Sequence, residues 1–109
     1  MVRISQPVPL DIETMRTATG GLLSDGAAPP ADELDLLIIQ LRGHLHLLIP
    51  ELEHRFGQND DARARAGIGE ARRRLSAGPT SLGPMRHAEC LARSVVALCA
   101  HLERLAVSP

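Results

Sequence analysis

The feature that most constrains this 109-residue chain is a run of aliphatic residues spaced four and three apart over residues 34 to 52. The run consists of Leu34, Ile38, Leu41, Leu45, Leu48 and Leu52. Because an α-helix turns once in about 3.6 residues, this spacing places all six side chains on one side of a helix. The sequence therefore predicts a long helix over residues 31–56 with a continuous apolar seam that faces a core.

Two further features of this segment bear on its packing. Pro50 lies inside the predicted helix and removes one backbone hydrogen bond, which predicts a kink near residues 47–49. Leu36, Ile39 and Leu47 lie off the seam. Either the helix is surrounded by other helices, or its outer face meets a second subunit. These three residues are therefore candidate partner-binding residues.

The composition favours helices throughout the chain. Phe56 is the only aromatic residue, so leucine and alanine supply most of the apolar side chains. Strands prefer β-branched and aromatic residues, whereas Ala, Leu, Arg and Glu are strong helix formers. A chain of this length is sufficient for one domain with one core, which we assign to residues 1–109.

Glycine and proline divide the chain into four helical segments, expected at about residues 11–24, 31–56, 61–77 and 84–106. Asp11 is a plausible N-cap for the first. In the third, Gly67 and Gly69 suggest close approach to a neighbouring helix. The last repeats the four-three spacing with Leu91, Val95, Leu98, Leu102 and Leu105. These features predict an all-α fold, an antiparallel four-helix bundle with a long, proline-kinked second helix.

The charge balance and the chain start exclude several classes of protein. All 12 basic residues are arginine and the net charge is -1, so no global basic field draws the chain onto nucleic acid or an anionic membrane. No segment has the apolar length of a signal peptide or of a membrane span, so we expect a cytoplasmic protein without membrane contact. Cys90 and Cys99 fall on opposite sides of one predicted helix and are expected to be buried, reduced thiols.

The stretch from Arg42 to Arg55, RGHLHLLIPELEHR, concentrates histidine and glutamate and could indicate a metal site. At about 100° per residue, however, His44 and Glu51 share one shoulder of the seam while His54 lies near the back of the helix. Carboxylate-bridged di-metal bundles use two inward-pointing Glu-x-x-His motifs, and here the motif occurs once and points outward. A site confined to this stretch is therefore not expected.

A site would need residues of the last helix, where His87, Cys90 and His101 share one side. This gives an alternative hypothesis, a metal-binding protein or small enzyme using five residues between the second and fourth helices. The five are His44, Glu51, His87, Cys90 and His101. No orienting acid or Cys-x-x-Cys spacing accompanies them, so we favour partly buried structural residues and predict no cofactor.

An arginine cluster in the third segment raises a second alternative, a regulator that contacts DNA. Its members are Arg63, Arg65, Arg72, Arg73 and Arg74, with Glu70 as the only acid over residues 62 to 75. Such a cluster attracts phosphates, but charge runs are usually solvated faces, and this helix has no aromatic residue on which bases could stack. Nucleic acid is therefore not the expected partner, and pairing with acids of the second helix is the simpler interpretation.

Four stretches together resemble a known group of proteins. They are PLDIETMR (9–16), LRGHLHLLIPELE (41–53), IGEARRRL (68–75) and LARSVVALCAHLERL (91–105). They resemble a family of short actinobacterial proteins of unknown function that are labelled natural-product biosynthesis proteins. The resemblance implies a context of specialised metabolism, and it implies no mechanism and no functional residue.

These observations favour a small non-enzymatic helical protein with an accessory or regulatory role in specialised metabolism. The chain lacks a glycine-rich phosphate loop, a Gly-x-Ser-x-Gly motif and a His-Glu-x-x-His motif. We expect it to act by binding a protein or a small molecule, as a homodimer or with a partner protein. The metal-site and DNA-contact hypotheses remain the alternatives.

Overall fold

The computed structural model describes residues 12–25, 29–56, 61–78 and 83–107, which form four α-helices without a strand. They are α1 (Ile12–Asp25), α2 (Ala31–Phe56), α3 (Ala62–Ala77) and α4 (Gly83–Val107). The predicted all-α class is confirmed, and every helix boundary lies within one residue of its predicted position. The proposed N-cap Asp11 lies outside the described residues. α2 continues through Pro50 without interruption, and the kink expected there stays a prediction.

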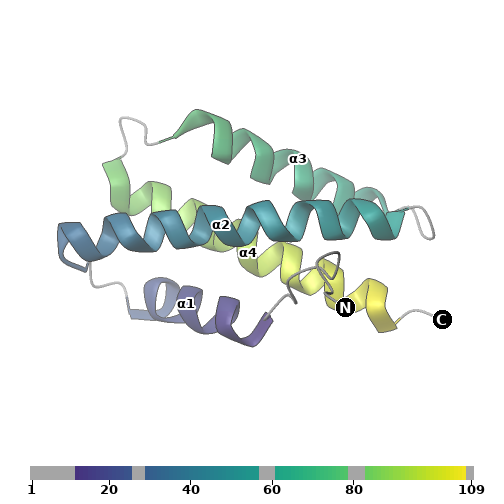
Figure 1. Cartoon of the computed structure of the whole chain (residues 1–109), viewed down its shortest axis with the longest axis horizontal. Helices are drawn as coiled ribbons and strands as arrows, with labels where there is room; N and C mark the ends of the chain where they lie inside the picture. The colour runs from purple at the N-terminus through teal and green to yellow at the C-terminus, as the bar shows by residue number, and fades with distance from the viewer. Residues whose placement is uncertain (1–11, 26–28, 57–60, 79–82, 108–109) are drawn as a thin grey trace, which may run out of the picture.

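α2 and α4 each contact all of the other helices. The described parts of α1 and α3 do not contact each other. Figure 1 shows α2 crossing in front of α4, with α1 on one side and α3 on the other, and successive helices running in opposite directions. The most extensive contact joins α2 to α4, so the inner face of α2 is covered and its outer face is not.

The apolar seams read from the sequence form the core. On α2, the buried members are Leu34, Leu41, Leu45, Leu48 and Leu52, with Ile38 packed at the edge. On α4, they are Leu91, Val95, Leu98 and Leu102. Each fully buried leucine contributes about 1.5–3 kcal/mol relative to an exposed one. The pairing of α2 with α4 is therefore the main source of stability.

A capping residue attaches the start of α3 to α4. At its start, the carboxylate of Asp61 accepts hydrogen bonds from the backbone N–H groups of Ala64 (3.1 Å) and Arg63 (2.9 Å), which lower the pKa of Asp61. The same carboxylate lies 2.6 Å from Arg104 of α4. The cap thus fixes the first turn of α3 and links it to the last turns of α4.

The two glycines of α3 differ in their surroundings. A Cβ atom built on Gly67 would lie 3.3 Å from Leu98 and 3.4 Å from His101 of α4, which confirms the close approach expected here. A Cβ atom on Gly69 would meet only Arg73 of the same helix. Only Gly67 is therefore needed for packing against a neighbouring helix.

Candidate functional site

The outer face of α2 is an exposed apolar surface. Leu36, Ile39 and Leu47, the residues predicted to bind a partner, are 67%, 66% and 42% exposed. Gly43 lies between Ile39 and Leu47, and Pro50 follows Leu47. Both are on the same side of the helix and are also exposed. We call these five residues the α2 outer face. No other described helix covers it, and no charged residue lies within it.

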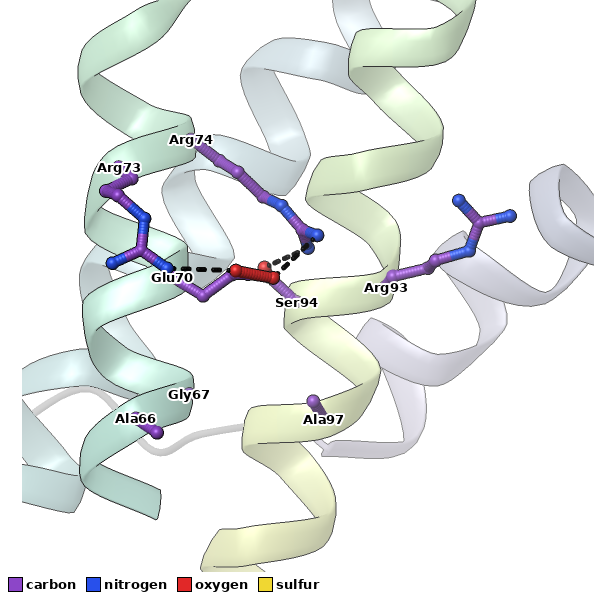
Figure 2. A pocket seen from close by; sticks show the side chains of 8 residues that line it. All are labelled: Ala66, Gly67, Glu70, Arg73, Arg74, Arg93, Ser94 and Ala97. Carbon is purple, nitrogen blue, oxygen red and sulfur yellow. Dashed lines mark hydrogen bonds and ion pairs between the residues drawn. The ribbon is translucent and has the colours of Figure 1, made fainter. Parts of the chain in front are cut away.

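A concave feature lies between α3 and α4. This groove, with a volume of about 470 Å³, has a floor of small residues and walls that carry arginines. Its lining consists of Ala66, Gly67, Glu70, Arg73, Arg74, Arg93, Ser94 and Ala97, which are drawn in Figure 2. Ala66, Gly67 and Ala97 contribute little side-chain volume to this part of the groove.

Arg74 spans the groove and ties α3 to α4. Its Nη1 donates to the Cys90 carbonyl oxygen (2.8 Å) and to Ser94 Oγ (2.7 Å), while its Nη2 lies 3.0 Å from Glu70 Oε1. The other carboxylate oxygen of Glu70, Oε2, accepts a hydrogen bond from Arg73 Nη2 at 3.0 Å. Figure 2 shows Arg93 directed away from Glu70. An anion entering the groove therefore competes with Glu70 for Arg73 and Arg74.

The five arginines considered as a polyanion contact do not act together. Arg72 pairs with Glu53 of α2 at 2.7 Å, whereas Arg74 points to α4 on the opposite side of α3. Arg73 and Arg74 share Glu70. Arg63 and Arg65 are exposed near the start of the helix. Because Arg72, Arg73 and Arg74 are paired with acids in the described part of the chain, the surface attracts phosphate less than the sequence suggests.

The residues proposed for a site between the second and fourth helices do not all lie on flanks that meet. The α4 flank with Cys90, Ser94 and His101 faces α3, because it contacts Arg74 and Gly67 there. On α2, Arg42 donates to the Leu75 carbonyl oxygen of α3 at 3.0 Å, and Glu53 pairs with Arg72.

His44 lies two residues from Arg42, and Glu51 lies two residues from Glu53. A separation of two residues corresponds to about 200° around the helix, so both lie far from the side of α2 that faces α3. They therefore point away from α3, and the two flanks do not meet. Glu51 instead pairs with Arg55 at 3.2 Å. Among the residues that the structure describes, no three His, Cys, Asp or Glu side chains converge as a metal site would require.

Comparison with known proteins places the chain in a family. Residues 13–107 match the model of the family of unknown function DUF6415. The chain belongs to DUF6415. The match covers α2, α3 and α4 completely and all of α1 except its first residue, so the DUF6415 pattern and the helical fold coincide. No curated protein and no solved structure matches the chain. No helix in the described ranges of this DUF6415 protein is long and apolar enough to cross a membrane.

Three histidines of this DUF6415 member are held in environments that disfavour their charged form. The Nε2 atoms of His44 and His87 are buried, and neither has a hydrogen-bond partner among the described residues. Burial lowers the pKa of both side chains below 6.5, and nearby Arg42 lowers that of His87 further. Burial also lowers the pKa of His101, whose Nδ1 lies 3.0 Å from Arg104. The neutral form of all three imidazoles is therefore favoured in the folded chain.

We expect the DUF6415 protein to lose stability as the pH falls below 6.5. Below this value the unfolded chain binds protons at these histidines that the folded chain does not, so acid favours unfolding. His87→Leu should flatten the fall in the free energy of unfolding, measured by urea denaturation between pH 7.5 and 5. His46→Leu, at an exposed position of α2, is the control and should leave the slope unchanged. Equal slopes for wild type and His87→Leu would contradict this account of His87.

Proposed function

We propose that this protein is a non-enzymatic helical accessory module of specialised metabolism that acts by binding another protein through the α2 outer face. The observation that carries the proposal is the exposure of Leu36, Ile39 and Leu47 on one side of α2, with no charged residue between them on that side. Burying apolar surface contributes about 25 cal/mol per Å². Contiguous exposed apolar patches on globular proteins commonly mark interaction sites.

The two alternatives have less support from the side-chain geometry. A metal-binding or catalytic role required His44 and Glu51 to meet Cys90 and His101, and these pairs lie on different flanks. A DNA-contacting role required free arginines on α3, and the guanidinium groups of Arg72, Arg73 and Arg74 are paired with glutamates. The α2 outer face has no such competing partner within the described chain.

The proposal is tested in the source organism by deletion and complementation. We expect the profile of specialised metabolites, measured by liquid chromatography and mass spectrometry, to change when the gene is deleted. The wild-type gene should restore it, and Leu36→Glu with Ile39→Glu should not, because two carboxylates on this face oppose burial against a partner. A deletion that leaves the profile unchanged would remove the metabolic part of the proposal.

A matched control separates loss of binding from loss of folding. Val96→Glu with Ala100→Glu places two carboxylates on an exposed side of α4. This control should restore the profile, and far-ultraviolet circular dichroism should show the same helix content for both double variants. Full complementation by Leu36→Glu with Ile39→Glu would show that the α2 outer face does not carry the function.

A further inference from the structure

The exposed residues on one side of α2, the side that carries the α2 outer face, have a spacing that is the same from either end. They are Asp32, Leu36, Ile39, Gly43, Leu47, Pro50 and His54. The steps between them are four, three, four, four, three and four residues, so Gly43 is the centre of the pattern. At about 100° per residue, all seven lie within an arc of about 80° on the helix surface. An antiparallel copy of α2 would therefore present the same surface in matching layers.

We propose that the partner of the α2 outer face is a second copy of this chain, bound antiparallel about a two-fold axis that passes beside Gly43. This inference rests on the proposed function and specifies the partner. In such an isologous interface, residue i meets residue j and j meets i. The layers pair Ile39 with Leu47 of the second copy, Leu36 with Pro50, and Asp32 with His54. Gly43 meets its own equivalent on the axis.

Gly43 has no explanation within a single chain. It lies in the interior of α2, where glycine is the weakest helix former after proline. Apart from its chain neighbours and the backbone of its own helix, a Cβ atom built on it would have no atom of the described residues within 4 Å, so packing within the described chain does not require glycine there. On a two-fold axis, however, two glycines allow the two helix backbones to approach closely, so that the flanking aliphatic side chains interlock.

The distribution of charge favours the antiparallel arrangement over the parallel one. Three acids, Asp32, Glu33 and Asp35, lie at the start of α2 and form no ion pair within the described chain. Towards the other end of α2, each acid is paired with an arginine: Glu51 with Arg55, and Glu53 with Arg72. His54, also near this end, lies on the proposed contact surface. A parallel pair would place the two acidic ends together. The antiparallel pair separates them by about 24 Å or more, beyond the range of strong repulsion at physiological salt.

The experiment uses opposite charges placed on the proposed axis. Gly43→Glu and Gly43→Arg should each fold, because position 43 is exposed and both residues are better helix formers than glycine. Each variant alone should dissociate at least about ten times more readily than wild type in sedimentation velocity, since like charges meet at the axis. An equimolar mixture should form a heterodimer, because only the mixed pair brings opposite charges together there.

The outcomes distinguish this inference from the proposed function. A wild-type chain that sediments as a monomer up to high micromolar concentration would overturn the second copy as partner, and the complementation test would then still judge the α2 outer face. Self-association that Leu36→Glu with Ile39→Glu abolishes but that neither Gly43 variant weakens would retain the face and overturn the axis. Failure of the mixture to form heterodimers would likewise overturn the axis.

Discussion

Leu45→Ala is expected to lower the free energy of unfolding by about 2–5 kcal/mol. Leu45 is completely buried in the contact between α2 and α4. Its truncation removes apolar contacts and leaves a cavity that the surrounding helices fill only in part. The measurement is urea denaturation followed by far-ultraviolet circular dichroism. Wild type and variant should show the same dependence of the free energy of unfolding on urea concentration, so that only the midpoint changes.

The matched control for this prediction is Leu47→Ala. Leu47 is two residues further along the same helix and is 42% exposed on the outer face. In dilute protein its truncation should change the free energy of unfolding by less than about 0.5–1 kcal/mol, because little packing is lost. Similar losses for the two variants would show that α2 is rotated or surrounded, and would remove the basis for an exposed outer face.

Pro50→Ala is expected to raise the free energy of unfolding by about 1–3 kcal/mol, measured in dilute protein. Pro50 lies inside α2 and has no N–H to donate to the His46 carbonyl group four residues earlier. Alanine restores that hydrogen bond and removes the ring from the preceding turn. Part of this gain is offset because alanine leaves the unfolded chain more freedom than proline does.

Pro84→Ala is the control for position within a helix. Pro84 is exposed in the first turn of α4, where a backbone N–H would have no partner within the helix. Its replacement should change stability by less than about 0.5 kcal/mol. A Pro50→Ala variant no more stable than wild type would mean that the bundle already compensates for the missing hydrogen bond. The loss of self-association in the same variant would agree with Pro50 as part of the interface.

The helices and the core could be predicted because they depend on local rules. The four-three spacing from Leu34 to Leu52 specifies which side of α2 is buried whichever helix covers it. Proline and glycine at the connections ended the helices close to where the structure ends them. Leu36, Ile39 and Leu47 could be recognised as excess apolar residues for the same reason, since they fall outside a seam that is already complete.

The relations between helices could not be read from the spacing. The hypothesis of a metal or catalytic site required the flank of α4 with Cys90 and His101 to meet His44, and this flank faces α3. A helical wheel gives directions around one axis and does not identify the neighbour in each direction. Arg74 shows the same limit. In the sequence it is one of five clustered arginines, whereas in the fold its hydrogen bonds to Cys90 and Ser94 make it a tie between two helices.

The sequence by itself determined the all-α class, the extent of each helix and the buried side of α2 and α4, because hydrophobic periodicity and helix-ending residues act within one segment. Only the tertiary structure decided that α4 lies between α1 and α3, that the arginines of α3 are divided between two flanks, and that the α2 outer face stays uncovered. These properties depend on which surfaces meet when the four helices bury their seams together. That choice is made by the packing of the whole chain and not by any single helix.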